Sequence, residues 1–387
     1  MKWMISEDKL GPDQREVISD LSKDWKNTWI KGHAGSGKSV LLIHLLRDYL
    51  AKHPTANVCV VVFTNSLVDM LKVGIKELNL EKRYSSTIPV MTIYKFNNSA
   101  SHYDVVFCDE VQDLPVSFLN ELKARSKQVI VAGDEAQSIY TNVPVFDEPP
   151  ASPGQISGTL NAQQKPLHYI YRMTRSVVAL LSKVFTTLLS GRPNVEKNDV
   201  EIKFCKAGSL KREIEYIWKE ATKINQLRSD EIVAVLLPHI DNVVEFSNLV
   251  LRQNGASEWS IVKNGFGKHD FGNMNTHLKS KNIPLMYVGQ GYGSLETADS
   301  SNRIILMTYH SSKGLDFDHV FLPMLGTAIH LPAEKAETLC FVALSRSKYN
   351  LIISYSGDLY PPMQKFMRGK APIEIESISA AKGGIII

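Results

Sequence analysis

The sequence has few of the features that are typical of membrane, secreted or zinc-binding proteins. No uninterrupted apolar stretch approaches the roughly 20 residues that a membrane-spanning helix needs. The cysteines, Cys59, Cys108, Cys205 and Cys340, lie far apart and form no CxxC pair, which disfavours a zinc site or a disulfide framework. The N-terminal residues lack an apolar core of signal-peptide length. We therefore expect a cytoplasmic protein with no membrane partner.

Charge of one sign is also not in large excess. A formal net charge of +4 is compatible with a polyanionic partner but does not identify one. With 44% hydrophobic and 22% charged residues the composition is typical of globular proteins, and 387 residues can form two domains with separate cores. The function must therefore be sought in motifs.

Short β-branched runs alternate with segments of helical spacing. The runs 57–63, 103–110, 127–134 and 303–310 predict buried parallel strands, and 39–53 and 117–126 predict helices between them. This alternation is typical of an α/β fold with parallel sheets flanked by helices. The proline-rich tract 142–158 predicts a linker, which gives domains 1–160 and 161–387, and the turn-rich tract 289–302 predicts a loop.

A phosphate-binding loop is predicted at residues 32–39, GHAGSGKS, which fit G-x-x-x-x-G-K-[ST] between an apolar run and a helical pattern. Its glycines allow backbone N–H groups to surround phosphates, while the lysine reaches the β- and γ-oxygens and the serine ligates Mg²⁺. The residues expected to hold ATP here are Gly32, Ala34, Gly35, Ser36, Gly37, Lys38 and Ser39.

Two adjacent carboxylates end the apolar run VVFCDE at residues 105–110. An acid at a strand end can hold Mg²⁺ beside a phosphate site, and a second can polarise the attacking water. We assign these roles to Asp109 and Glu110, with an acidic turn as the alternative interpretation. Such a site also needs arginines against the γ-phosphate, for which Arg172 and Arg346 are candidates, although most arginines are simply exposed on the surface.

These segments, with others in the same order, resemble superfamily 1 helicases of the UvrD/Rep type. The matching segments are 10–18 (Q motif), 32–39 (motif I), 63–71 (Ia), 108–113 (II), 132–140 (III), 170–176 (IV), 307–317 (V) and 341–354 (VI). The resemblance implies two tandem RecA-like domains that use ATP and Mg²⁺ at the cleft between them. It also implies movement along a single strand, DNA more than RNA, in the 3′ to 5′ direction.

The resemblance assigns roles around the nucleotide. Gln14 would recognise the adenine edge and Tyr171 would stack on the ring. Gln137 would sense the γ-phosphate, Arg172 would contact it, and Arg346 would be the arginine finger.

Motif V contributes Gly314 and Asp316, the latter toward the ribose hydroxyl. The chain departs from the family where Asp316 replaces a glutamate, where Ile170 replaces an asparagine, and where TNVP follows Tyr140 in place of an arginine and a tryptophan. These departures affect the residues expected at the ribose contact and at one base-stacking position.

The resemblance places the nucleic-acid strand against hydroxyl, amide and aromatic side chains. Tyr140 would stack on a base, and the other positions that match are Thr64, Asn65, Thr92, Tyr94 and His310. The alternative interpretation is helix capping for the two threonines and core packing for Tyr94.

The intervals between the motifs indicate a compact form of the family. The interval from Thr64 to Asp109 is shorter than the roughly 50 residues of a small domain, and most of 172–310 is needed for the second RecA-like domain. We therefore expect the accessory subdomains to be missing and a partner protein to supply duplex separation. The alternatives are an RNA-directed motor, a nucleic-acid-stimulated ATPase switch subunit, and, more distantly, a small-molecule kinase.

Overall fold

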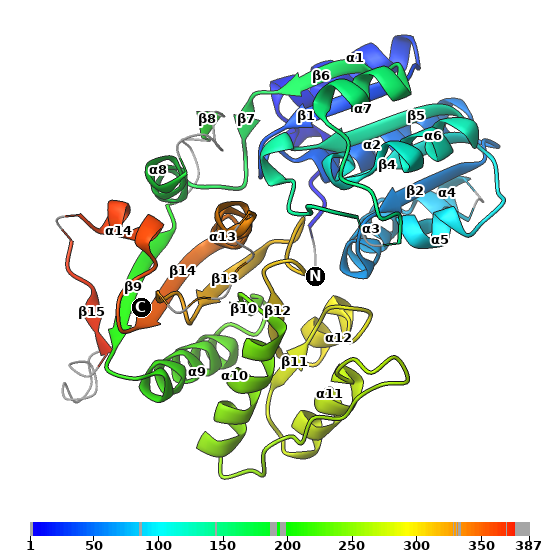
Figure 1. The fold of residues 1–387 in the computed structure, drawn as a ribbon. Coiled ribbons are helices and arrows are strands. Elements are labelled where there is room, and N and C mark those ends of the chain that lie inside the picture. Colours follow the sequence, from blue (N-terminus) through cyan, green and yellow to red (C-terminus); the bar gives the residue numbers. More distant parts are fainter. Residues whose placement is uncertain are drawn as a thin grey trace. The chain divides into compact units, whose positions relative to one another are not determined.

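The computed structural model describes residues 3–84, 87–143, 145–185, 192–193, 199–327, 329, 331, 334–368 and 370–375. It divides the chain into two compact units, one formed by Met1–Met173 with Leu188–Val195 and the other by Thr174–Thr187 with Glu196–Ile387. Each contains a parallel sheet flanked by helices, which confirms the predicted α/β class of tandem RecA-like domains (Figure 1). In the described part of the chain, no helix has both the length and the apolar character needed to cross a membrane.

The first unit is built on a six-stranded parallel sheet in the order β3-β2-β4-β5-β1-β6. Its strands are β1 (Thr28–Gly32), β2 (Val58–Val62), β3 (Val90–Thr92), β4 (Tyr103–Cys108), β5 (Ser126–Gly133) and β6 (Gln163–Leu167), and the short pair β7 (Tyr169–Ile170) and β8 (Arg192–Pro193) follows. Every residue of β2 is buried, as expected for a β-branched strand covered on both faces. Strands β2, β4 and β5 confirm the predictions for these segments.

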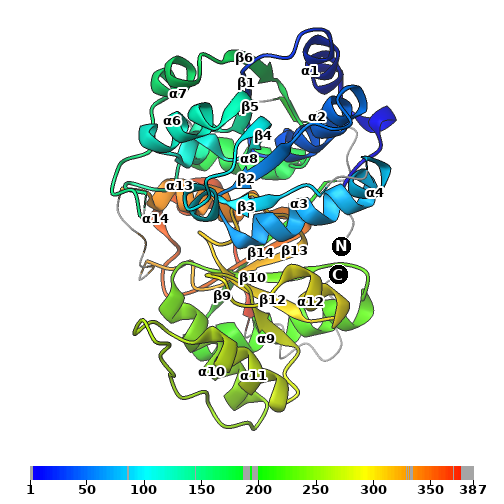
Figure 2. The ribbon, with the colours of Figure 1, turned by 90° about the vertical axis from the view of Figure 1, so that its right-hand side faces the viewer.

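Helices cover both faces of this sheet. They are α1 (Pro12–Lys23), α2 (Lys38–Lys52), α3 (Asn65–Glu77), α4 (Leu80–Tyr84), α5 (Ile93–Asn97), α6 (Val116–Ala124) and α7 (Pro153–Leu160), with 3₁₀ turns η1 (Glu7–Lys9), η2 (Val111–Asp113) and η3 (Glu135–Gln137). Helices α1 and α2 pack together on one side, and α6 and α7 on the other (Figure 2). The predicted helices at 39–53 and 117–126 are confirmed as α2 and α6.

The tract expected to be a linker is partly helical. Pro153 starts α7, where its missing N–H is not needed, and Ser152 and Gln155 form a capping box at this end. The chain then returns to the same sheet, because β6 pairs with β1. The first unit consequently runs to Met173, beyond residue 160 where the sequence suggested the boundary.

The second unit contains a seven-stranded parallel sheet in the order β11-β12-β10-β13-β14-β9-β15. Its strands are β9 (Glu201–Ala207), β10 (Val233–Leu237), β11 (Leu285–Tyr287), β12 (Ile304–Thr308), β13 (Phe317–Leu322), β14 (Ser347–Ser356) and β15 (Ile373–Glu374). Its helices are α8 (Arg175–Val184), α9 (Leu210–Leu227), α10 (Ile240–Gln253), α11 (Phe271–Ser280), α12 (Leu295–Ser300), α13 (Ala336–Leu344) and α14 (Pro361–Met367). Strand β12 confirms the strand predicted at 303–310. The segment 289–302, which was predicted to be a loop, contains the short helix α12.

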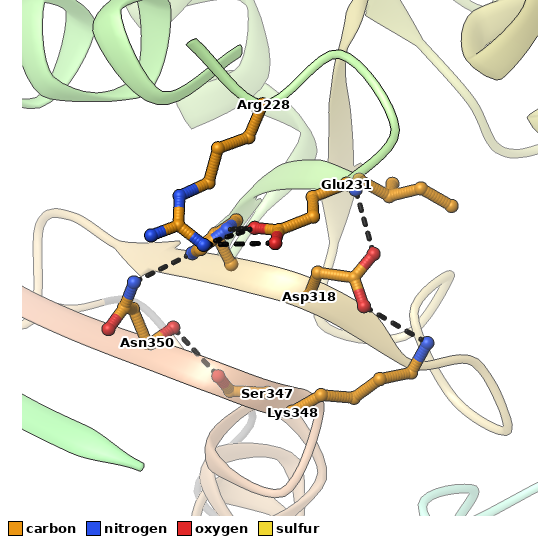
Figure 3. A network of polar contacts seen from close by, with 8 residues as sticks. Arg228, Glu231, Asp318, Ser347, Lys348 and Asn350 are labelled. Carbon is orange, nitrogen blue, oxygen red and sulfur yellow. Dashed lines mark hydrogen bonds and ion pairs between the residues drawn. The ribbon is translucent and has the colours of Figure 1, made fainter.

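A polar network fixes the starts of β10, β13 and β14 (Figure 3). The buried His319 ring contacts the Glu231 carboxylate on one side and the Asn350 amide on the other. Arg228 donates to Glu231 at 3.0 Å. Partial burial acts to raise the pKa of Glu231, but the contacts with His319 and Arg228 together lower it. Asp318 accepts from the Ile232 N–H at 2.8 Å. The network therefore anchors the strand end that directly follows Arg346.

The intervals between the motifs hold little beyond the two sheets. Between β2 and β4 the described residues form only α3, α4, β3 and α5. Between Arg172 and His310 they form α8, β8, β9, α9, β10, α10, α11, β11, α12 and β12. In the described parts of these two intervals no added subdomain is present, in keeping with the compact form expected from the sequence.

Candidate nucleotide and nucleic-acid sites

The phosphate-binding loop joins β1 to α2 in the first unit. Gly35 and Gly37 have φ of +76° and +78°, the left-handed region that favours glycine. A Cβ at Gly35 would lie 2.6 Å from Cβ of Arg172, and one at Gly37 would collide with the Gln14 amide. The Lys38 ammonium donates to the carbonyls of Gly32 at 2.9 Å and His33 at 3.1 Å. The loop is thus a cradle whose shape depends on two glycines.

We expect Gly37→Ala to lower the melting temperature and to weaken ATP binding. Alanine at positive φ costs about 1–2 kcal/mol, and its methyl group would displace the Gln14 side chain. Thermal melts and equilibrium nucleotide binding measure the two effects. Gly158→Ala is the matched control, because no atom lies within 4 Å of a Cβ there. Equal behaviour of the two variants would contradict this description of the loop.

Gln14 connects helix α1 to the phosphate-binding loop. Its Oε1 accepts from the Gly11 N–H at 2.9 Å and its Nε2 donates to the Ser36 carbonyl at 3.0 Å. The Ser36 hydroxyl is buried and has no hydrogen-bond partner among the described residues. This unsatisfied group on the loop fits a site that takes a polar ligand.

Tyr171 and Arg172 lie against the same loop. Their N–H groups both donate to the Gly35 carbonyl, at 2.8 and 3.0 Å. The Tyr171 hydroxyl donates to Asp13 Oδ1 at 2.9 Å, and a Cβ at Gly11 would collide with this tyrosine. Burial and the Asp13 carboxylate raise the pKa of Tyr171, which remains neutral. Both residues therefore belong to the first unit, whereas the sequence assigned them to residues 161–387.

The expected metal ligands are in direct contact. The Ser39 hydroxyl at the start of α2 donates to Asp109 Oδ2 at 2.5 Å. Burial and the adjacent Glu110 carboxylate raise the pKa of Asp109 to about 6, against the lowering effect of Ser39 and Lys38. A hydroxyl and a carboxylate together suit Mg²⁺, which prefers oxygen ligands and takes the rest from phosphates and water. The pair fits the ion that the sequence predicts.

Glu110 is held by a chain of side chains that the sequence did not identify. Its φ is +58°, and its Oε2 accepts from Gln112 Nε2 at 2.5 Å. The other amide atom of Gln112 accepts from the Asp134 N–H at 3.0 Å, and Gln137 Nε2 donates to Asp134 Oδ2 at 2.8 Å. Glu110 and Gln137 are thus linked through Gln112 and Asp134. Both linking residues lie within the segments 108–113 and 132–140, but only their packing shows the role.

The expected strand contacts follow β2 and β3 on the carboxyl edge of the same sheet. Thr64 caps α3, because its hydroxyl accepts a hydrogen bond from the Leu67 N–H at 3.3 Å. Thr92 caps α5, because its hydroxyl accepts from the Lys95 N–H at 3.4 Å. The capping interpretation is therefore correct for both threonines. Asn65 is exposed at the first turn of α3. Parallel strands end on one edge, so these residues lie on the same edge as the phosphate-binding loop.

Aromatic rings gather at this edge around Phe63. Tyr140 stacks on Phe63 with ring centroids 4.5 Å apart, and Tyr94 meets it edge-on at 6.1 Å. Burial raises the pKa of both tyrosines. The packing interpretation therefore holds for both rings, and each tyrosine keeps part of its surface exposed.

A cationic groove of about 620 Å³ lies beside β3. It is bounded by α3, α4 and α5, and the exposed Lys72, Lys76, Lys82 and Lys95 line it together with one acid, Glu81. None of these lysines forms an ion pair with a described residue. The groove begins next to Thr92, whose hydroxyl caps the helix that carries Lys95.

In the second unit, motifs V and VI meet at Arg346. Its Nη1 donates to the Leu315 carbonyl at 2.9 Å and its Nε to the Val342 carbonyl at 2.7 Å, while Nη2 donates to the Ser345 hydroxyl at 2.6 Å. Only 1% of Arg346 is exposed, so it is not an ordinary surface arginine.

The remaining motif V residues lie on the segment between β12 and β13. Gly314 has φ of +78°, which allows the turn before Leu315. The Asp316 carboxylate lies 3.9 Å from the Lys348 ammonium. Burial, with smaller contributions from His239 and Lys313, lowers the pKa of His310, so its imidazole is neutral at pH 7.

Two family models match the sequence. The model described as Schlafen group 3, DNA/RNA helicase domain, matches residues 26–223, half of the chain, and contains the phosphate-binding loop and the acid pair. The model described as UvrD-like helicase C-terminal domain matches residues 291–358, which contain His310 and Arg346. No curated protein matches the sequence.

Solved structures of a viral helicase resemble the fold. Arterivirus nonstructural protein 10 (helicase) is 14% identical, with 88% of this chain and 61% of that chain covered and a TM-score of 0.42. Its complex with DNA gives 14% identity, 88% and 63% coverage and a TM-score of 0.44. The chain thus spans less than two thirds of the length of those proteins.

Proposed function

This chain belongs to the Schlafen group 3 DNA/RNA helicase domain family, and we propose that it is an ATP-driven motor that moves along single-stranded nucleic acid. The observation that carries the proposal is the carboxyl edge of the first sheet. There the phosphate cradle, the contact between Ser39 and Asp109, and Glu110 lie on the same edge as Thr64 and Thr92. Ligands of open α/β sheets bind at this edge.

The first unit supplies the groups that ATP hydrolysis requires. The loop amides and Lys38 would hold the phosphates, and Ser39 and Asp109 would hold Mg²⁺, which when bound neutralises phosphate charge. Glu110, kept in place by Gln112, orients the attacking water and accepts its proton. Gln137 is positioned through Asp134 to respond to the γ-phosphate.

Further residues complete the nucleotide site. Gln14 and Tyr171 lie where the loop meets α1 and are assigned to adenine recognition. Arg172, held by the Gly35 carbonyl, contacts the γ-phosphate in the ground state. Arg346, beside Gly314 and Asp316, stabilises the charge that develops on the transferred phosphoryl group.

The strand would run along the same edge of the first sheet. Asn65 and the two capping threonines bind backbone, Tyr94 and Tyr140 stack on bases, and the cationic groove beside β3 attracts further phosphates. In the second unit, His310, whose pKa is lowered by burial, is proposed as a further contact to the strand. DNA is proposed as the preferred strand, and an RNA strand is the alternative because contacts to the 2′-hydroxyl decide between them.

A protein partner is proposed for duplex separation. In the described parts of the intervals between the motifs, no added subdomain is present that could meet a duplex ahead of the motor. We therefore expect the chain alone to move along single strands with little unwinding of duplex.

Movement can be measured as ATP-dependent release of streptavidin from a biotin at one end of an oligonucleotide. Because movement is proposed in the 3′ to 5′ direction, we expect streptavidin to be released from the 5′ end of a DNA strand. Less release is expected from an RNA strand. A complementary strand should be displaced only slightly. Streptavidin that stays on both ends while the strand stimulates ATP hydrolysis would contradict the motor and favour an ATPase switch subunit. Efficient unwinding by the chain alone would contradict the need for a partner.

A further inference from the structure

An exposed phenylalanine marks the segment between α10 and α11. Phe266 is 91% exposed, the largest exposure of any large hydrophobic side chain in the described part of the chain. Burying such a ring is worth about 2 kcal/mol, so its exposure calls for a reason. Ile261 and Val262 in the same segment are also exposed, at 54% and 39%. We call residues 261–269 the Phe266 loop, and it lies outside both family-model matches.

Hydrogen bonds fix the backbone at the tip of the Phe266 loop. The Asn264 side chain accepts from the N–H groups of Phe266 at 3.0 Å and Lys268 at 3.1 Å. Its amide nitrogen donates to the Tyr292 hydroxyl at 2.9 Å. The Asn264 N–H donates to the Lys268 carbonyl at 2.7 Å, and Gly267 adopts φ of +73° to close the turn. These bonds fix the backbone that carries Phe266, so the backbone loses little conformational entropy when the ring meets a ligand.

The base of the loop is tied to the unit's core. Buried Trp259 donates through Nε1 to Asn273 of α11 at 2.8 Å, and its N–H donates to Asn248 of α10 at 2.9 Å. The Asp270 N–H donates to the Val262 carbonyl at 2.8 Å. The position of the tip is therefore set by the second unit itself.

The surroundings of the ring are cationic and open. Lys263 and Lys268 are exposed and form no ion pair with a described residue, and the Phe266 loop contains no acid. Of the acids that flank the loop in sequence, Glu258 pairs with Arg252 and Asp270 caps α11. Nothing lies within 4 Å of a Cβ at Gly265 or Gly267, so the flanking residues leave the ring faces uncovered.

We propose that the Phe266 loop is a base-stacking contact for single-stranded nucleic acid, with Lys263 and Lys268 on the flanking phosphates. An aromatic face together with unpaired cations is the combination that single-strand binding uses. A protein partner would instead require a broader apolar surface than Phe266 and the partly exposed Ile261 and Val262 provide. The proposal rests on the proposed function, because it adds a contact to the same strand.

The test compares binding of a labelled oligothymidylate with binding of an abasic strand of equal length. Phe266→Ala should weaken binding of the oligothymidylate by about fivefold or more, since stacking contributes about 1–3 kcal/mol per base. Phe266→Trp should retain it. On the abasic strand, Phe266→Ala and wild type should bind equally. Replacing Lys263 and Lys268 by glutamine should make the binding affinity for both strands less dependent on salt concentration.

Leu227→Ala is the matched control, an exposed apolar residue of the same unit at 70% exposure, and should change neither affinity. Thermal melts check that each variant is folded. If wild type binds the oligothymidylate and Phe266→Ala binds it equally well, the proposal is overturned while the proposed function stands, and the Phe266 loop is left for a protein partner. Equal weakening on the abasic strand would also overturn it. No binding by wild type would overturn both.

Discussion

Glu110→Gln is expected to lower kcat for ATP hydrolysis by at least about a hundredfold while ATP still binds. The substitution removes the carboxylate that accepts the proton of the attacking water, and such a base contributes about 10²–10⁴ in rate. Glutamine has the same size and can still pair with the Gln112 amide, so the fold should be unchanged. Steady-state turnover and equilibrium binding of ATP measure the two effects separately.

Two further variants make this test specific. Asp104→Asn changes an acid of the same strand that pairs with Lys127 at 2.8 Å and accepts from the Asn57 N–H, and it should leave kcat unchanged. Lys38→Ala should also stop turnover but should weaken ATP binding, because its ammonium lies in the phosphate-binding loop. A Glu110→Gln enzyme with most of the wild-type kcat would show that the water is activated elsewhere.

Arg346→Ala is expected to lower kcat by about 10³–10⁵, the usual contribution of an arginine finger, with a smaller effect on nucleotide affinity. The substitution also leaves the Leu315 and Val342 carbonyls without their donor, so the melting temperature should fall. Arg346→Lys separates the two effects, since it keeps the charge but not the planar fork of donors. It should remain strongly impaired in kcat.

The matched control for Arg346 is Arg303→Ala. Arg303 belongs to the same unit and also donates to a main-chain carbonyl, that of Leu285 at 3.3 Å. Its loss should cost stability and leave kcat unchanged. A fall of less than tenfold in kcat for Arg346→Ala would reduce Arg346 to a structural residue that joins motifs V and VI.

The sheets and the phosphate-binding loop could be predicted because their signals are local. Strand β2 is a run of valines with a single cysteine, and Gly35 and Gly37 occupy the positions where positive φ is required. Spacing and residue type suffice for such features. The two capping threonines were also foreseen as one of two interpretations, and the structure supports that one without excluding a contact to the strand.

Strand β6 could not be predicted, because its signal is not local. The sequence QQKPL is mostly polar and contains a proline. Both features are common in edge strands and rare in buried strands. Its strand character comes from pairing with β1, more than a hundred residues earlier in the chain. Because β6 was not predicted, the sequence placed the domain boundary near residue 160. Tyr171 and Arg172 were therefore assigned to a different domain from the phosphate-binding loop that they contact.

The supporting side chains of the site were missed for the same reason. Asp13 accepts from the Tyr171 hydroxyl, and Gln112 connects Glu110 to Asp134. The Glu110–Gln112 contact is local, but the contact of Gln112 with Asp134 and that of Asp13 with Tyr171 join residues that come together only when the unit is folded. Sequence spacing gives the residues that carry chemistry, and packing gives those that hold them in place.

The most direct test of the central claim is ATP turnover by the purified chain with and without a single-stranded oligonucleotide. A single strand is expected to stimulate hydrolysis well above the rate of the chain alone, and duplex of the same sequence is expected to stimulate it much less. Glu110→Gln should show no turnover under any condition. Turnover that is the same with and without a single strand would contradict a motor driven along nucleic acid.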